Sequence, residues 1–323
     1  EGLNLDSTEN LILRGRFAPT PSGKMHLGNL FCALLSWLSI RSKNGVWVLR
    51  QEDLDPQRTS QKFAEQLEED LLWLGLSFSE GGTKGGKYGP YFQSKCENIY
   101  RKVFLKLQQS AKIYPCFCTR SLLHGANAPH LSDGRVVYDG RCKALTPEEI
   151  DQQMKIQPPA YRIEVPDEEI SFEDGCLGSC RENPAREFGD FVIKRSDGGF
   201  AYQLAVVVDD IRMKVTEVVR GQDLLSSTAP QIYLYRLLKA PVPRFYHIPV
   251  LLSPDGKRLS KRDQDVSLET LRKKYTAPEI LGRLAYLAGQ LKEPHAISAE
   301  ELAAHFDWRH VPQENLKIPA GLF

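Results

Sequence analysis

Two segments of the chain, more than 200 residues apart, combine residue types that could bind and activate a nucleotide. Residues 19–29 include Gly23 and Gly28, which let a backbone approach a ligand, and His26, which can donate a hydrogen bond to a phosphate oxygen. Residues 253–262 form a turn and a basic loop whose cations could neutralise departing pyrophosphate. Taken alone, the first segment is equally compatible with a tight turn capped by a histidine, and the second favours a solvated basic loop.

The first of these segments lies between a predicted strand and a predicted helix. Residues 11–18 are interpreted as a buried strand, and from residue 27 apolar side chains recur at helical spacing, at Leu30, Leu34, Leu35 and Leu38. Residues 46–49 form a second short strand. This order predicts a βαβ unit, and therefore a parallel sheet with a right-handed crossover. Ligands of such sheets bind beyond the carboxyl ends of the strands, where residues 19–29 are expected.

The pattern divides the chain into four predicted parts. Residues 1–112 form the first half of a nucleotide-binding α/β domain, with further helices at 60–74 and 97–108. Residues 113–186 break into short segments with cysteines and prolines, which indicates an insertion. The α/β pattern returns over 187–265 with a helix near 227–238, and residues 266–323 form a small helical subdomain. We therefore predict an α/β fold with a Rossmann-type, doubly wound parallel sheet.

Composition limits the class of protein. Apolar residues make up 41% of the 323 residues and charged residues 26%, values that are typical of a globular protein with a full core. The chain has no apolar run long enough for a membrane span, and its first residues do not resemble a secretory signal. Seven cysteines, an odd number, favour a reducing cytoplasm over a disulfide framework. A net charge of +1 means that any nucleic-acid contact must use local basic patches.

Considered together, the two segments resemble the signatures of class I aminoacyl-tRNA synthetases. Residues 19–29 resemble the HIGH signature, and Arg258-Leu-Ser-Lys-Arg262 resembles the KMSKS signature. The resemblance is closer still to the glutamyl branch, which shares six ordered blocks: Arg16-Phe-Ala-Pro-Thr-Pro-Ser-Gly23, Leu49-Arg-Gln-Glu-Asp-Leu-Asp-Pro56, Trp73-Leu-Gly75, Gly89-Pro-Tyr-Phe-Gln-Ser94, Tyr202-Gln-Leu-Ala-Val-Val-Val-Asp-Asp210 and Val219-Arg-Gly-Gln-Asp223.

The resemblance implies an ATP site with magnesium bound to the nucleotide. Its expected residues are His26, Gly28, Asn29, Asp223, Arg258 and Lys261, of which His26 and Lys261 are the expected catalytic pair. Three positions depart from the family pattern. Asn29 replaces the second histidine of HIGH, Arg258 replaces the first lysine of KMSKS and keeps its charge, and Thr20 replaces a serine and keeps its hydroxyl.

The resemblance also implies a pocket for L-glutamate. Arg16 and Arg220 can bind a carboxylate bidentately, Glu52 can hold the substrate ammonium, and Tyr202 can add a hydroxyl contact. The neighbouring residues Phe17, Ala18, Pro19 and Thr20 are expected to line the same pocket. The alternative for Arg16 and Glu52 is that they form interior salt bridges, and for Tyr202 that it is a core aromatic, the interpretation favoured for Tyr202 without the resemblance.

A metal site is a further prediction. Cys116-x-Cys118 alone is a weak motif. With Tyr138 and Cys142 it resembles the zinc site of the glutamyl-queuosine branch, which implies one structural Zn²⁺ on Cys116, Cys118, Tyr138 and Cys142. His124 and His130 are more ordinary ligands, Cys176 with Cys180 forms a rival pair, and reduced cysteines without metal are the remaining interpretation.

The resemblance is best to the glutamyl-Q tRNA(Asp) synthetase branch. Fewer than 65 residues follow the KMSKS-like loop, so we expect no anticodon-reading module of the usual kind. That branch implies transfer of glutamate to queuosine in the anticodon loop of tRNA(Asp), by a cytoplasmic protein that we expect to be monomeric and not bound to a membrane. Two alternatives remain: a minimal glutamyl-tRNA synthetase that charges a tRNA 3′ end, and a catalytically inactive synthetase-like protein that binds RNA.

Overall fold

The structure is a computed structural model that describes residues 12–119, 137–259 and 267–323. Its largest element is a seven-stranded sheet in the order β3-β2-β1-β9-β10-β6-β7. The neighbouring strands are parallel except β6 and β7, which form an antiparallel hairpin. The strands are β1 (Arg14–Phe17), β2 (Val46–Leu49), β3 (Glu80–Gly81), β6 (Ile170–Asp174), β7 (Gly178–Glu182), β9 (Glu217–Gly221) and β10 (Arg244–Ile248).

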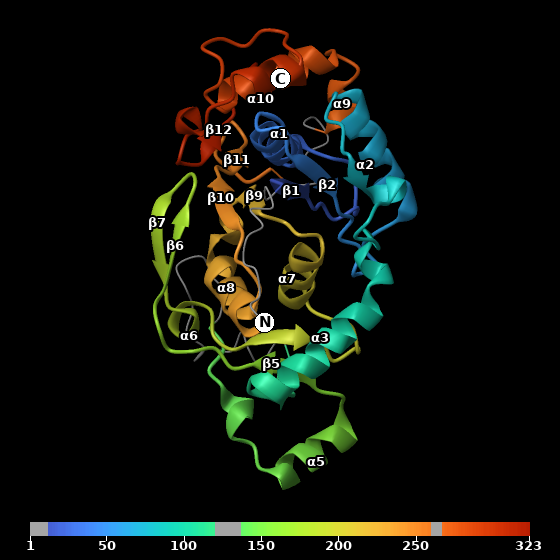
Figure 1. The fold of residues 1–323 in the computed structure, drawn as a ribbon, viewed down its shortest axis with the longest axis vertical. Helices are drawn as coiled ribbons and strands as arrows, with labels where there is room; N and C mark the ends of the chain where they lie inside the picture. Colours follow the sequence, from blue (N-terminus) through green and yellow to red (C-terminus); the bar gives the residue numbers. More distant parts are fainter. Residues whose placement is uncertain (1–11, 120–136, 260–266) are drawn as a thin grey trace, which may run out of the picture.

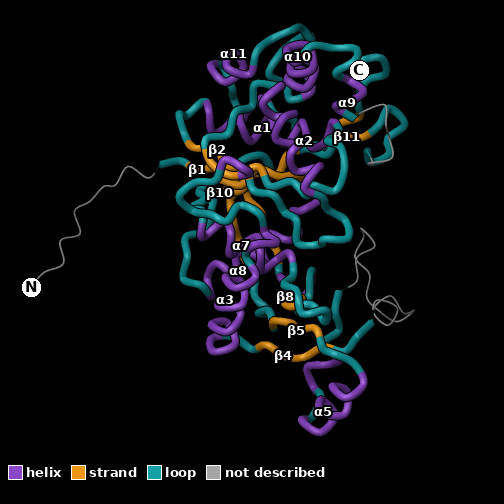
Figure 2. Tube along the Cα trace, turned by 90° about the vertical axis from the view of Figure 1, so that its right-hand side faces the viewer, coloured by secondary structure: helices purple, strands orange, loops and turns teal. Residues whose placement is uncertain are grey.

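Helices cover both faces of this sheet, as the predicted doubly wound fold requires (Figures 1 and 2). Successive residues of a strand point to opposite faces, so Val219 belongs to one apolar core and its neighbour Val218 to the other. The first core includes residues of α1 and α2, and the second includes residues of α3, α7 and α8. These helices are α1 (Leu27–Arg41), α2 (Gln61–Trp73), α3 (Glu97–Ser110), α7 (Tyr202–Arg212) and α8 (Thr228–Leu237).

Local sequence signals explain where the predicted elements begin and end. Strand β2 has the predicted bounds, and α2 begins after Ser60, whose side chain accepts a hydrogen bond from the Phe63 amide as an N-cap. Helix α1 ends at Arg41. The chain then turns through Asn44, which has a positive φ of 55°, into β2.

A separate three-stranded antiparallel sheet lies beyond α7 and α8 (Figure 2). It contains β4 (Ile113–Cys116), β5 (Ala160–Ile163) and β8 (Phe191–Lys194), next to α5 (Pro147–Ile156) and α6 (Pro184–Glu187). Strand pairing crosses the predicted boundaries of the insertion, because β6 and β7 extend the main sheet while β8 pairs with β5. A local sequence pattern indicates a strand but does not indicate its partner.

The C-terminal residues pack against α1 at the top of the molecule (Figure 1). The described residues of the predicted helical subdomain, 267–323, form three short helices and a strand. These are α9 (Leu268–Leu271), α10 (Ala277–Leu287), α11 (Ala299–Ala304) and β12 (Leu316–Lys317), which pairs with β11 (Leu251–Leu252). Five 3-10 turns complete the described elements: η1 (Gly82–Lys84), η2 (Gln93–Lys95), η3 (Arg141–Ala144), η4 (Gln222–Ser227) and η6 (Trp308–His310).

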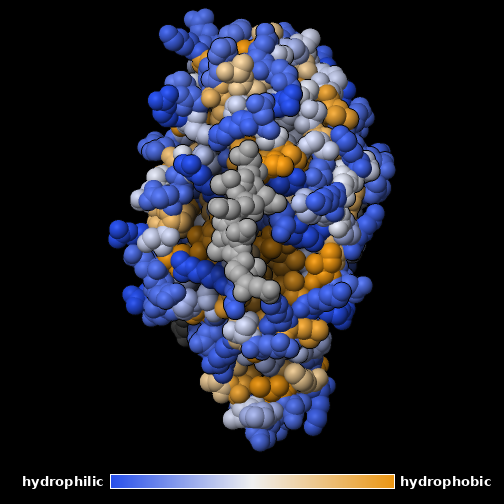
Figure 3. Space-filling view, in the orientation of Figure 1, coloured by the Kyte–Doolittle hydropathy of each residue, from blue (hydrophilic) through white to orange (hydrophobic). Residues whose placement is uncertain are grey.

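Hydrophilic residues cover most of the face shown in Figure 3, and hydrophobic residues gather around its middle and near its lower end. Within the described ranges, no helix has the length and apolar character that crossing a bilayer would require.

Candidate active site

A cavity of about 520 Å³ lies at the carboxyl ends of β1, β9 and β10. Every described residue of the predicted glutamate and ATP sites lines it. These residues are Arg16, Phe17, Ala18, Pro19, Thr20, His26, Gly28, Asn29, Glu52, Tyr202, Arg220, Asp223 and Arg258. Lys261, the other predicted catalytic residue, lies outside the described residues. The fold therefore brings together side chains that are more than 200 positions apart in the sequence, at the edge of the sheet where ligands of such folds bind.

His26 is both a helix cap and a cavity residue. Its Nδ1 accepts a hydrogen bond of 3.0 Å from the Gly28 amide, and its own amide donates to Asn29 Oδ1 at 3.2 Å. Because Nδ1 is an acceptor, we assign the ring proton to Nε2, where it can be donated. A β-carbon on Gly28 would lie 2.9 Å from His26 Cε1, so glycine leaves room for this ring orientation. The capping and nucleotide interpretations of residues 19–29 are therefore compatible.

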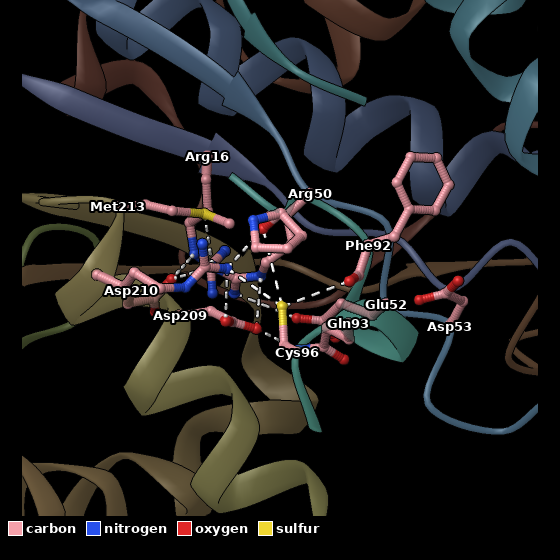
Figure 4. Close-up of polar contacts among 12 residues, drawn as sticks. Arg16, Arg50, Glu52, Asp53, Phe92, Gln93, Cys96, Asp209, Asp210 and Met213 are labelled. Carbon is pink, nitrogen blue, oxygen red and sulfur yellow. Dashed lines mark hydrogen bonds and ion pairs between the residues drawn. The ribbon is translucent and has the colours of Figure 1, made fainter. Parts of the chain in front are cut away.

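Arg16 is held by a buried network of charges behind the cavity (Figure 4). Its Nε donates to Asp210 Oδ1 at 3.1 Å, and Arg50 Nη1 donates to the same oxygen at 2.6 Å. Arg50 also reaches Glu52 Oε1 through Nη2 at 3.2 Å. Arg50, through Asp210, therefore connects Arg16 to Glu52, the arginine and the carboxylate that were predicted to bind a carboxylate and the ammonium of one substrate.

The two carboxyl groups in this network have pKa values that shift in opposite directions. Burial raises the pKa of Glu52, although the charges of Arg50 and Arg16 oppose the shift. Burial also acts to raise the pKa of Asp210, but Arg16 and Arg50 outweigh it and lower the pKa. Asp210 is thus the permanent counterion, whereas Glu52 would gain from a further cation such as a substrate ammonium.

Sequence reasoning missed Arg50, Asp209 and Asp210 as parts of the site. Asp209 accepts hydrogen bonds from Gln93 Nε2 at 3.0 Å and Tyr100 Oη at 2.7 Å, and it anchors the network from α7. The available signal was a pair of adjacent carboxylates directly after the apolar residues of α7, since paired acids at the end of a buried helix require buried cations.

Arg220 is a buried cation that has only neutral hydrogen-bond partners. Its Nε donates to His247 Nε2 at 3.0 Å, Nη1 to Gln231 Oε1 at 2.7 Å and Nη2 to Thr228 Oγ1 at 3.0 Å. In the part of the chain that the structure describes, no carboxylate forms an ion pair with it at the 4.0 Å limit. Burial lowers the pKa of Arg220. An anionic ligand in the cavity would supply the missing countercharge.

Two other cavity residues have pKa values that keep them neutral. Burial, followed by the charge of Glu52, raises the pKa of Tyr202, so its phenol can act as a hydrogen-bond donor. Tyr202 begins α7 and is half-buried at the cavity, so it is not a core aromatic. Burial raises the pKa of the Cys32 thiol to about 12, which makes Cys32 a poor nucleophile.

Arg258 and Asp223, which both line the cavity, form an ion pair. Arg258 Nη2 lies 3.0 Å from Asp223 Oδ2, and the two side chains are 64% and 44% exposed. This ion pair joins the first residues of the KMSKS-like segment to η4. Because it is exposed to solvent, it contributes little to stability, and its charges remain accessible to a ligand.

The four predicted metal ligands form one cluster at the base of the small sheet. Cys118 Sγ lies 3.5 Å from Cys142 Sγ and 3.9 Å from Tyr138 Oη, and Cys116 Sγ lies 3.6 Å from Tyr138 Oη. The three sulfurs lie within 4.8 Å of one another. Tetrahedral zinc, with bonds of about 2.3 Å to sulfur, needs ligand atoms roughly 3.5–3.8 Å apart, so this donor set fits zinc.

Arg162 supports the cluster from β5. Its Nε donates to Cys116 Sγ at 3.2 Å, and its guanidinium lies 3.7 Å from the centre of the Tyr138 ring. Burial acts to raise the pKa of Cys116, but Arg162 outweighs it and lowers the pKa, which favours the thiolate that a metal requires. The rivals Cys176 and Cys180 do not join this group, and His124 and His130 lie outside the described residues.

The fold and the cavity are those of a nucleotide-dependent synthetase, and the chain belongs to the class I tRNA synthetases (E and Q): residues 12–318 match the model of their catalytic domain. It is a ligase-type enzyme of that family. Similar curated proteins include the glutamyl-Q tRNA(Asp) synthetase of Symbiobacterium thermophilum, 49% identical over 96% of this chain and 97% of the relative. The enzyme of the same name from Nitratidesulfovibrio vulgaris is 43% identical over 96% and 97%.

Glutamate–tRNA ligases are also similar to this chain. The ligase of a Sulfurihydrogenibium species is 40% identical over 91% of this chain and 62% of the relative. Among solved structures, a glutamate tRNA ligase from Elizabethkingia meningosepticum in complex with its amino acid has a TM-score of 0.82. It is 29% identical and matches 96% of this chain and 68% of that one. These structures confirm the predicted α/β synthetase fold.

Proposed function

We propose that the protein activates L-glutamate with ATP as glutamyl-adenylate and transfers the glutamyl group to queuosine at the wobble position of tRNA(Asp). The observation that carries the proposal is the cavity itself. Two buried arginines, Arg16 and Arg220, and one buried carboxylate, Glu52, line it together with His26 of the nucleotide loop. A substrate with two carboxylates and one ammonium complements these charges.

The roles of the side chains follow from their partners. Arg220 has no carboxylate partner in the described chain and binds the side-chain carboxylate of glutamate. Glu52 has a raised pKa and binds the ammonium group. Arg16 orients the α-carboxylate, and Tyr202 donates its phenolic hydrogen to the bound amino acid.

Activation requires no protein nucleophile. An oxygen of the glutamate α-carboxylate attacks the α-phosphorus of ATP, a new O–P bond forms, and the bond to the β-phosphate oxygen breaks to release pyrophosphate. His26 Nε2–H donates to the α-phosphate as charge builds there, and the cations Arg258 and Lys261 neutralise the departing pyrophosphate. Magnesium bound to the ATP offsets phosphate charge.

The adenylate is a mixed anhydride, so a nucleophile can attack its carbonyl carbon directly. We assign this role to a hydroxyl of the queuosine cyclopentene ring, which releases AMP and forms a glutamyl ester. Support for this acceptor comes from the relatives, since the two glutamyl-Q tRNA(Asp) synthetases are 49% and 43% identical to this chain. We further propose that the protein is a monomer, that it acts on tRNA in the cytoplasm and that it does not bind a membrane.

We propose one structural zinc on Cys116, Cys118, Tyr138 and Cys142. The ligand separations and the chemistry of the donor set support it. The cluster joins β4 to the turn η3, so the metal would fix the fold of this region. It lies in a different sheet from the cavity and would take no part in the chemistry.

The position of transferred label tests the proposal. The protein is incubated with ATP, magnesium, labelled glutamate and total tRNA, the RNA is digested with a guanosine-specific nuclease, and the labelled fragment is identified. Parallel tRNA from cells that lack queuosine is the control. Label on an anticodon-loop fragment that disappears in the control is the expected result. Label on the 3′-terminal fragment in both samples would identify a minimal glutamyl-tRNA synthetase instead.

Glutamate-dependent pyrophosphate exchange separates these enzymes from the inactive alternative. The chain contains His26, Glu52 and both pocket arginines, so we expect glutamate-dependent exchange. This assay separates an active enzyme from an inactive one and does not depend on which nucleoside accepts the glutamate. Absence of exchange in the presence of total tRNA would overturn the proposed activation step.

A further inference from the structure

A chain of three hydrogen-bonded side chains runs from the cavity across three neighbouring strands of the sheet. Arg220 lies on β9, His247 is its register partner on β10, and Asp174 ends β6, the next strand along. Arg220 Nε lies 3.0 Å from His247 Nε2, and His247 Nδ1 lies 2.6 Å from Asp174 Oδ2. All three are buried, with His247 and the Asp174 side chain fully inaccessible to solvent.

The hydrogen bonds fix the protonation state of His247. Arg220 Nε can only donate, so His247 Nε2 must accept, and the ring proton lies on Nδ1, which donates to Asp174. Thr228 Oγ1, which accepts from Arg220 Nη2, lies 3.2 Å from His247 Nε2 and can donate to it. A protonated imidazole would place an N–H against the Arg220 N–H, so only the neutral Nδ1–H tautomer satisfies every partner.

Asp174 fixes that tautomer and is itself held in place by backbone donors. Asp174 also accepts backbone N–H groups from Cys176, Leu177 and His247. Burial acts to raise the pKa of Asp174, but the hydrogen bond with His247, followed by those from the Cys176 and Leu177 amides, outweighs it and lowers the pKa. The pKa of His247 is lowered, chiefly by burial, which also favours the neutral ring.

The consequence for Arg220 follows from counting its hydrogens. A guanidinium has five N–H groups, and His247, Gln231 and Thr228 take one each on Nε, Nη1 and Nη2. One hydrogen remains on each terminal nitrogen and can be donated to a carboxylate ligand. Gln231 is fixed in turn because its amide donates to Gln203 Oε1 at 2.7 Å.

We infer that His247 and Asp174 are positioning residues that hold Arg220 in a fork with no competing anion, and thereby set the preference of the pocket for a carboxylate over an amide side chain. This inference rests on the proposed function. His247, a neutral acceptor at Arg220 Nε, orients the guanidinium without neutralising its charge, which stays available to the substrate carboxylate. A protein carboxylate in place of His247 would form an ion pair with Arg220 and compete with the substrate. Glutamine would offer no countercharge and would leave Arg220 unpaired.

Three substitutions isolate the positioning effect. His247→Phe keeps a ring that can stack on Phe245, whose centroid lies 6.0 Å away, but removes the acceptor for Arg220. His247→Gln can restore an acceptor near the position of Nε2. Asp174→Asn keeps shape and removes the charge that fixes the tautomer. Asp70→Asn is the matched control, because Asp70 is also a buried carboxylate paired with an arginine, Arg272, but does not line the cavity.

The measurements are calorimetric affinities for L-glutamate and ATP, together with pyrophosphate exchange with L-glutamate and L-glutamine. We expect His247→Phe to weaken glutamate binding by about tenfold or more while ATP binding changes by less than about twofold. Asp174→Asn should also weaken glutamate binding, by a smaller factor than His247→Phe, and should leave ATP binding nearly unchanged. His247→Gln should recover most of the lost affinity, and the preference for glutamate over glutamine should fall only in His247→Phe and Asp174→Asn.

Unchanged glutamate affinity in His247→Phe would overturn the inference. Equal losses of glutamate and ATP affinity, accompanied by a similar loss in Asp70→Asn, would also overturn it by showing a general structural role. Should His247→Phe fail to fold, the comparison of Asp174→Asn with His247→Gln decides on the same criteria. If the unsubstituted protein itself bound ATP but no glutamate, the proposed function would fail, and this inference would fail with it.

Discussion

Arg50 Nη1 lies 2.6 Å from Asp210 Oδ1, and the two side chains are 0% and 2% exposed. Neither residue was assigned a role from the sequence, yet this pair supports the two side chains that are proposed to bind the α-carboxylate and the ammonium of glutamate. Asp210 also accepts from Arg16, and Arg50 also donates to Glu52. The substrate-facing groups therefore depend on a charge network that lies behind them (Figure 4).

Asp210→Asn should destabilise the fold by about 3–5 kcal/mol, because it leaves two buried arginines with one fewer counterion. The free energy of unfolding from urea titration measures the effect. Asp255→Asn is the comparison, since its ion pair with Lys257 is exposed and its loss should change the unfolding midpoint little. An unchanged midpoint in Asp210→Asn would show that the network does not support the fold.

Glutamate activation should weaken on acidification at a pH above the ordinary carboxyl range of about 4.3. Burial raises the pKa of Glu52, and only its ionised form can pair with the substrate ammonium. The pH profile of kcat/KM for glutamate in pyrophosphate exchange reports this pKa in the free enzyme. A profile that stays flat until the substrate carboxyl itself titrates would contradict the role of Glu52.

The raised pKa of Glu52 also predicts how folding stability depends on pH, and the sign is opposite to that of an ordinary carboxylate in an ion pair, whose pKa is lowered. Since the folded pKa of Glu52 lies above its unfolded value, the folded state binds more protons between the two, and stability falls as pH rises through this window. Glu52→Gln cannot titrate. The stability of the wild-type protein relative to Glu52→Gln should therefore increase as the pH falls through this window.

Arg220→Lys should lose most of the glutamate-dependent exchange even though it keeps the positive charge. An ammonium cannot donate to His247, Gln231 and Thr228 in the observed directions and also present a paired donor to the substrate. We expect KM for glutamate to rise roughly 10- to 100-fold, and Arg220→Ala to lose still more. Near-normal exchange in either variant would remove Arg220 from the pocket.

Protein purified without chelator should contain about one zinc per chain. Metal analysis measures the content, and removal of the metal should lower the unfolding temperature. Cys142→Ser and Tyr138→Phe should reduce the zinc content, because both remove a ligand of the cluster. Cys176→Ser, which alters the rival pair, should retain it. Wild-type protein without zinc, or equal loss of zinc in Cys176→Ser, would refute this ligand set.

The sequence determined the parts of the site in which chemistry and local structure coincide. Residues 19–29 carry the binding groups and also the signals that begin α1, since His26 both caps the helix and lines the cavity. Strand β2 has the predicted bounds because a short apolar run after a turn is a local signal. The order of these elements was enough to predict a doubly wound sheet and the edge at which its ligands bind.

Only the tertiary structure decided which buried polar groups support the site. Asp210 lies 194 positions from Arg16, and Asp174 lies 73 positions from His247, so no local spacing pairs them. Strand order brings β6 beside β10 and thereby places Asp174 behind Arg220, although β6 belongs to the predicted insertion. The physical reason is that a buried charge is stable only beside a partner of opposite charge or a hydrogen-bonding group. Long-range strand pairing determines which residue is that partner, and a local sequence pattern does not encode this pairing.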